Sequence, residues 1–235
     1  MKVIASVFFL LFIPAVFHAH AQQYDFINRT LRDLEANQRF VNPLAGKSEA
    51  DLNSTVEGSP YFDENLINGE IYTRQAEKFS DVPMRYNAYS DEIEFKLPDG
   101  VVYILSDPKK IFQIKLNDKV VVFSEYISNK EVREGFLFVL YSGKSSLYLR
   151  RYKVYKPKVP SNGIINEVPA KYVDKPLEYY IKPENGLPQL FNTKRDLLRL
   201  LSKHSSEIET YMKKENVNMN DNNDLIKVLK YYDSL

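Results

Sequence analysis

The stretch 135–155 constrains the fold more than any other part of this 235-residue chain. Residues 136–141 are apolar at successive positions, which is typical of a strand buried on both faces. Ser142 and Gly143 then supply a tight turn, because glycine reaches positive φ without steric cost. Residues 145–155 follow as a long strand rich in tyrosine, leucine and valine. The stretch therefore predicts a β-hairpin with its first arm in the centre of a sheet.

Short strands with turn residues between them are predicted from Ser59 onward. Residues 92–97 alternate charged and apolar side chains, which is typical of a strand with one face in water. A further strand over 171–182 is expected to be interrupted at Pro176. The other predicted strands are 70–73, 82–87, 101–105, 111–116 and 119–125. Successive hairpins of this kind predict an antiparallel meander, either a curled sheet or a partly closed barrel.

After Asn192 the apolar period lengthens from two residues to that of a helix. Thr193 with Asp196 three residues later resembles a helix-start box, and a break is expected near Ser205. Asp221 or Asn222 is placed to cap a last helix. We therefore predict an α+β fold in which the antiparallel meander is followed by a small C-terminal helical subdomain.

Residues 1–21 have the three parts of a secretory signal peptide. Lys2 is followed by an apolar run over 3–17 and by a small-x-small cleavage site over 19–21. The apolar run is shorter than the ~20 residues that a membrane span needs. We expect export to the periplasm or the cell exterior, with cleavage after Ala21.

Sequence composition indicates three regions after the signal peptide and limits the classes of partner that the chain can bind. We expect an N-terminal helix and linker over 22–58, an antiparallel β domain over 59–182 and a helical subdomain over 183–235. Without residues 1–21 the chain has 31 basic and 31 acidic residues, so it has no long-range attraction for nucleic acid. No second run is long enough to span a membrane. With no cysteine in the chain, stability cannot come from disulfides.

Four segments resemble a family of small exported proteins of Gram-negative bacteria. They are GSPY at 58–61, VPMRY at 82–86, YYIK at 179–182 and DLIKVLKYYDSL at 224–235. The resemblance covers roughly residues 58–235. It implies a shared fold with structural motifs, and the family has no assigned activity.

No complete catalytic, cofactor or metal set is present in the sequence. His204 is the one histidine outside the signal peptide, and no G-x-S-x-G elbow supplies a nucleophile. The Gly-Lys-Ser triplets at 46–48 and 143–145 lack the earlier glycine of a phosphate loop. The segment 218–224 lacks the glycine and the final glutamate of a calcium loop. We therefore predict no cofactor and no metal.

The strand predicted over 145–155 carries the candidate interaction surface. Tyrosine and arginine are enriched at binding hot spots. Alternation should place Tyr148, Arg150 and Tyr152 on one face of this strand. It should place Arg151, Lys153 and Tyr155 on the other face. The alternative is that tyrosines fill the core and that the cations guard a solvated edge strand.

We therefore expect a non-catalytic exported protein that binds or assembles with an envelope protein or a glycan. The alternative is a hydrolase of a cell-envelope polymer that uses an Asp/Glu pair. Such a pair cannot be recognised from spacing in the sequence, because its members need to be close only in space.

Overall fold

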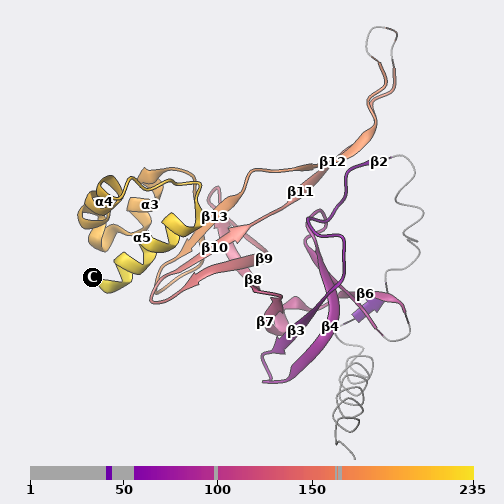
Figure 1. Ribbon diagram of the computed structural model, residues 1–235, viewed down its shortest axis with the longest axis horizontal. Helices are drawn as coiled ribbons and strands as arrows, with labels where there is room; N and C mark the ends of the chain where they lie inside the picture. The colour runs from indigo at the N-terminus through magenta and orange to yellow at the C-terminus, as the bar shows by residue number, and fades with distance from the viewer. Residues whose placement is uncertain (1–40, 44–55, 98–99, 162, 164–165) are drawn as a thin grey trace, which may run out of the picture.

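The computed structural model describes residues 41–43, 56–97, 100–161, 163 and 166–235 (Figure 1). The signal peptide, the N-terminal helix and most of the linker predicted from the sequence lie outside these residues. Within them the α+β class is confirmed, because a large sheet region precedes a small helical part at the C-terminus. None of the helices described is long and apolar enough to cross a membrane.

One sheet contains eleven strands in the order β1-β6-β5-β4-β3-β7-β8-β14-β13-β10-β9. The strands are β1 Val41–Pro43, β3 Ile67–Thr73, β4 Lys78–Asn87, β5 Glu92–Lys96, β6 Val102–Leu105, β7 Ile111–Leu116, β8 Lys119–Ser128, β9 Glu131–Ser142, β10 Ser146–Arg150, β13 Glu178–Lys182 and β14 Gln189–Phe191. A short 3-10 helix, Pro108–Lys110, precedes β7. Strands β3, β4, β5 and β6 pair consecutively and antiparallel, and they form the predicted meander.

The last five strands of the order close into a ring, because β9 also pairs with β8. Strand β14 completes the ring by a parallel pairing of Gln189 with Ile127 of β8. All five strands contribute side chains to one small apolar cluster, which therefore fills the interior of the ring. Its members are Tyr126, Leu137 and Tyr180, with Val122, Tyr148 and Leu190 packed against them. The prediction of a partly closed barrel is confirmed.

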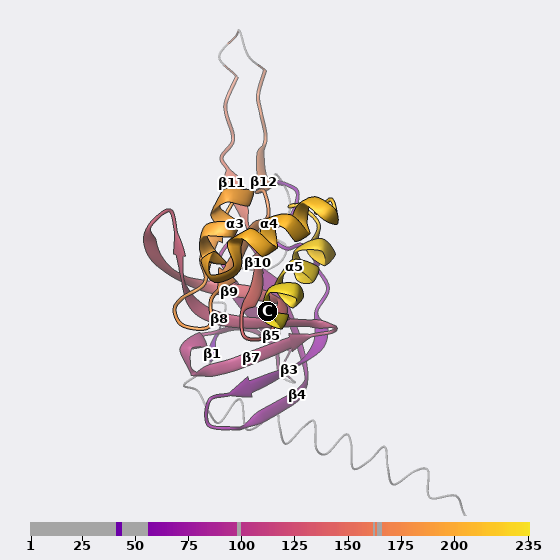
Figure 2. The ribbon, with the colours of Figure 1, turned by 90° about the vertical axis from the view of Figure 1, so that its left-hand side faces the viewer.

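The C-terminal helices cover the outside of the ring next to β9, β10 and β14 (Figure 2). They are α3 Lys194–Leu200, the 3-10 helix Ser202–His204, α4 Ser205–Lys214 and α5 Asn222–Ser234. Thr193 and Asp196 form the predicted capping box, and the Asp221 side chain accepts a hydrogen bond from the backbone N–H of Asp224. Apolar residues of the helices share one core with Leu147 and Tyr179 of the ring.

The end of α5 is held by the turn between β9 and β10. Tyr141 Oη donates to Asp233 Oδ2 over 2.9 Å, and Ser145 donates to Asp233 Oδ1 from Oγ over 2.7 Å and from its backbone N over 3.1 Å. A Cβ at Gly143 would collide with the Asp233 carboxylate. The Gly-Lys-Ser turn therefore binds an internal carboxylate, which explains the glycine without a phosphate.

A second, three-stranded sheet lies beside the first in the order β11-β12-β2. It contains β11 Lys153–Lys156, β12 Ala170–Asp174 and β2 Val56–Glu57. Residues that extend β11 and β12 project from the body as a long arm, which is held by a bridge between Val159 and Val168 (Figures 1 and 2).

One prediction about the C-terminal half is wrong, and one strand there was missed. Residues 171–182 were expected to form one interrupted strand, but β12 and β13 belong to different sheets. Strand β14 was not predicted, because three residues after a proline are too few to show a period. It forms because Ile127 N donates to Pro188 O over 2.7 Å and positions the segment beside β8.

Candidate functional site

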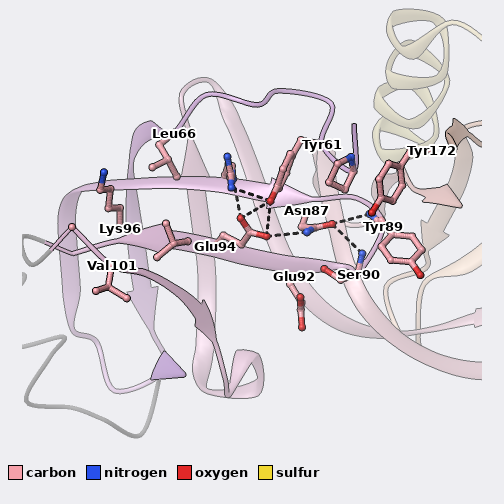
Figure 3. Close-up of a pocket in the computed structure, with 14 residues that line it drawn as sticks. Tyr61, Leu66, Asn87, Tyr89, Ser90, Glu92, Glu94, Lys96, Val101 and Tyr172 are labelled. Atoms are coloured by element: carbon pink, nitrogen blue, oxygen red, sulfur yellow. Dashed lines mark hydrogen bonds and ion pairs between the residues drawn. The ribbon is translucent and has the colours of Figure 1, made fainter. Parts of the chain in front are cut away.

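A groove of about 440 Å³ crosses the outer face of β4 and β5 (Figure 3). Antiparallel pairing sets Arg85 opposite Glu94 and Asn87 opposite Glu92, so these polar side chains share one face. On the opposite face the buried residues Met84, Tyr86, Ile93 and Phe95 join the core. The alternation predicted for residues 92–97 is thus confirmed, and it forms the floor of what we call the β4–β5 groove.

The centre of this face is buried, although the sequence predicted that it would be wet. Glu94 is 1% exposed. The chain around Tyr61 crosses over it, because Ala88 N donates to Pro60 O over 3.0 Å and Tyr61 forms a bridge with Asn87. A segment 33 residues earlier in the chain thereby covers the carboxylate.

Glu94 accepts hydrogen bonds from three side chains (Figure 3). Tyr61 Oη lies 3.0 Å and 2.9 Å from its two carboxylate oxygens. Arg85 Nε donates to Oε2 over 2.8 Å, and Asn87 Nδ2 donates to Oε1 over 2.8 Å. The guanidinium carbon of Arg85 also lies 3.9 Å from the centre of the Tyr61 ring. The arrangement is a buried, fully hydrogen-bonded ion pair with an aromatic cover.

This network favours a fixed charge state. Burial, followed by the charge of Glu94, raises the pKa of the Tyr61 hydroxyl well above its ordinary value, so Tyr61 remains a donor. The Glu94 carboxylate has no oxygen left for a substrate, because both oxygens are engaged and the side chain is covered. We interpret Glu94 as the structural anchor of the groove.

Two of the motifs that carry the family resemblance meet at this anchor. GSPY supplies Tyr61 and VPMRY supplies Arg85, and both contact Glu94. The YYIK motif places Tyr180 inside the ring, and the C-terminal motif supplies the Asp233 contact with the β9–β10 turn. All four motifs therefore have structural roles in this molecule.

Two further charged residues of β5 lie in the groove. Glu92 and Lys96 line it on either side of Glu94. Within the part of the chain that the structure describes, neither forms an ion pair. They are four residue steps apart on an extended strand, which separates their Cα atoms by about 13 Å. The groove therefore offers one carboxylate and one ammonium to a ligand, at opposite ends of its floor.

A cluster of tyrosines forms the Glu92 end of the groove. Tyr89 and Tyr172 line the groove, and their ring centres are 5.3 Å apart. Tyr155 lies 5.4 Å from Tyr172 and 6.3 Å from Tyr89. Tyr89 and Tyr155 are 49% and 40% exposed, which is unusual for large apolar rings in mutual contact. We call these three residues the tyrosine cluster.

The sequence did not indicate this cluster. Its members come from the turn after β4, from β11 and from β12, so no local spacing connects them. Tyr155 alone was among the predicted interaction residues. The high tyrosine content of the chain does not identify the cluster either, because tyrosines such as Tyr180 also fill the core.

The single strand predicted over 145–155 is wrong. Strand β10 ends at Arg150, and β11 begins at Lys153 in the second sheet. Lys153 N donates to Ala88 O over 2.9 Å, a contact with a residue 65 positions earlier that turns the chain out of the ring. The predicted two-face arrangement of the six residues is therefore lost.

The six residues lie in four separate environments. Tyr148 packs inside the ring, and Tyr152 Oη donates to Glu178 over 3.2 Å. The cations of Arg151 and Lys153 lie over the ring of Phe62, at 3.9 Å and 4.8 Å. Tyr155 belongs to the tyrosine cluster. The structure thus brings only one of the predicted residues to the groove region.

Arg150 lies between two acidic residues at one end of the ring. Its guanidinium is 3.7 Å from Asp91 and 3.6 Å from Glu178, and its side chain is 16% exposed. The Tyr152 ring lies 4.4 Å from its guanidinium carbon. Its Nε is buried without a hydrogen-bond partner among the described residues. These contacts are typical of a mostly buried arginine with a structural role.

Asp91 fits against Arg150 because residue 135 is a glycine. A Cβ at Gly135 would collide with the Asp91 carboxylate. Tyr86 Oη donates to Asp91 Oδ1 over 2.7 Å, and Phe136 N donates to the same oxygen over 3.4 Å. Burial raises the pKa of the Asp91 carboxyl above its ordinary value, although the Tyr86 hydrogen bond and Arg150 partly oppose the rise.

This raised pKa predicts a pH effect for Asp91→Asn. Folded Asp91 binds its proton at a higher pH than the unfolded chain does, so its contribution to stability falls as pH rises above about 3.9. The free energy of unfolding of the wild type minus that of the variant should therefore decrease with pH until Asp91 is fully ionised. Urea denaturation of both proteins across mild acid measures this difference, in which the other carboxylates cancel. A difference that is constant or rises with pH contradicts the assignment.

No family model, curated protein or solved structure matches the chain. Among the described residues, no group of three histidine, aspartate or glutamate side chains is arranged to hold a metal ion. The β4–β5 groove and its tyrosine cluster are therefore the candidate functional site.

Proposed function

We propose that this protein is a non-catalytic exported binding protein of a Gram-negative cell envelope, with its ligand in the β4–β5 groove. The observation that carries the proposal is the Glu94 network, which stabilises the floor of an open groove with exposed tyrosines at one end. A floor held by a buried ion pair is preorganised, and preorganisation lowers the cost of binding.

Several features support binding over catalysis. Among the described residues that line the groove there are two carboxylates, and Glu94 is covered and hydrogen-bonded, so of these two only Glu92 is available to a ligand. Hydrolysis of a glycosidic bond by the common route needs two carboxyl groups that flank the bond. The alternative of a polymer hydrolase with an Asp/Glu pair therefore has no support from this groove. Exposed tyrosine rings beside polar side chains are typical of recognition surfaces.

The partner is an envelope component, either a glycan or a protein. Export follows from the signal peptide expected at residues 1–21, and the balanced charge gives no basis for nucleic-acid binding. The resemblance to exported Gram-negative proteins agrees with this assignment.

Binding of the protein to separated fractions of the cell envelope tests the proposal. The chain from Gln22 should bind one fraction saturably, without releasing new reducing ends or amines. Tyr89→Ala should weaken this binding, because it removes an exposed ring from the groove. The matched control is Phe112→Ala, which removes a 56% exposed ring that lines a different cavity. Calorimetric titration measures affinity, and thermal denaturation checks that each variant is folded.

Two results would count against the proposal. Turnover of an envelope polymer that is abolished by Glu92→Gln would make the protein a hydrolase. Equal binding by wild type and Tyr89→Ala would place the ligand outside the groove.

A further inference from the structure

We propose that the β4–β5 groove binds an unbranched, β-1,4-linked oligosaccharide of gluco-configured pyranoses. This inference rests on the proposed function and names the class of ligand. It follows from the strand pairing beneath the groove, from the side chains that line it and from its dimensions.

The strand pairing disfavours a peptide bound by strand addition. Strand β4 pairs with both β3 and β5, and β5 pairs with both β4 and β6. The main-chain N–H and C=O groups beneath the groove are therefore used within the sheet. Strand addition needs a free edge whose main chain can pair with the peptide. A ligand in this groove is recognised by side chains.

The side chains suit a molecule with apolar faces and a polar rim. A gluco-configured pyranose has equatorial hydroxyls, so its C–H groups face up and down while its hydroxyls point outward. The rings of Tyr89 and Tyr172 offer apolar surface to such a face. Around them, the Ser90 hydroxyl, the Glu92 carboxylate and the Lys96 ammonium supply the acceptors and donors that hydroxyls require.

The dimensions and the charge fit a short, uncharged, extended chain. The floor follows β5 for about 13 Å, which is enough for two or three pyranose rings in a row. The volume of about 440 Å³ lies in the range of small-molecule sites. Among the described residues of the floor, the Glu92 carboxylate balances the Lys96 ammonium, and the Arg85 cation balances the Glu94 carboxylate. A β-1,4 linkage keeps successive rings extended, whereas an α-1,4 linkage curves the chain away from a strand.

Calorimetric titration with defined tetrasaccharides tests the inference on the full chain from Gln22. Cellotetraose or N,N′,N″,N‴-tetraacetylchitotetraose should bind saturably, and maltotetraose should bind about tenfold more weakly or not at all. Tyr89→Ala should reduce the affinity for the β-linked tetraose by about tenfold or more. Glu92→Gln should also reduce the affinity for the β-linked tetraose, because it weakens a polar contact that is independent of the Tyr89 side chain. Phe112→Ala should leave it unchanged.

Each result separates this inference from the proposed function. Equal affinity for maltotetraose, or β-linked binding that survives both Tyr89→Ala and Glu92→Gln, overturns the inference. If no tetrasaccharide binds but an envelope fraction still binds in a Tyr89-dependent way, the ligand class is wrong and the groove remains the binding site. If neither binds through the groove, both proposals fail.

Discussion

Replacing Arg85 with methionine is expected to lower the free energy of unfolding by about 3–5 kcal/mol, because Glu94 would remain buried without its countercharge. The side chains of Arg85 and Glu94 are 9% and 2% exposed, so solvent screens their interaction little. Urea denaturation at neutral pH, followed by circular dichroism, measures the change. An unchanged midpoint would show that the network does not hold the floor of the groove.

Two controls separate the loss of a buried charge pair from the loss of packing. The double variant Arg85→Met with Glu94→Leu should recover much of the stability, because it leaves no uncompensated charge. Lys78→Met breaks the exposed pair of Lys78 with Glu70 and should change stability little. Recovery in the double variant would identify desolvation of an unpaired charge as the cause.

Adjacent arginines should respond very differently to the same substitution. Arg150→Met should lower the free energy of unfolding by about 2–4 kcal/mol, because Arg150 compensates both Asp91 and Glu178 in a mostly buried position. Arg151→Met should cost about 0.5–1 kcal/mol, because it loses mainly the contact of its guanidinium with the Phe62 ring.

Denaturation of the two single variants under identical conditions provides the comparison. If both variants lower the free energy of unfolding by a similarly small amount, Arg150 is not a buried structural residue. It would then belong to an exposed binding surface, as the sequence predicted. Arg150→Lys refines the test, since it keeps the charge and removes the planar guanidinium that spans two carboxylates. A partial loss of stability is expected for that variant.

Local patterns in the sequence predicted what depends on neighbours in the chain. Residues 92–97 alternate because one face of β5 meets the core, and Thr193 with Asp196 begins α3 through a local capping box. The same patterns fail where distant segments decide the outcome. Glu94 alternates like a wet residue, yet Tyr61 covers it, and no period in β5 reports that contact.

The candidate site was mostly hidden for the same reason. The segment 145–155 shows no break in its pattern between Leu147 and Tyr155, but the hydrogen bond of Lys153 N to Ala88 O accompanies its entry into a second sheet. The tyrosine cluster combines residues from three segments that are too far apart in the chain to form one local sequence pattern. Identity of residue type was visible in the sequence, and proximity was not.

The way the ring closes has a consequence for how the chain folds. Strands β8 and β9 are consecutive and pair over nine register positions, from Val120 with Val139 to Ser128 with Glu131. By contrast, β14 meets β8 at one register position, Ile127 with Gln189. Short-range pairing costs little loop-closure entropy, whereas a parallel contact across some sixty residues costs more and forms late. During vectorial synthesis β7, β8 and β9 can pair first. The second half of β8, beyond Val121, then has one edge unpaired until the residues before α3 arrive. An unpaired strand edge can pair with a wrong segment, and Pro188 and β14 remove this risk by pairing with Ile127.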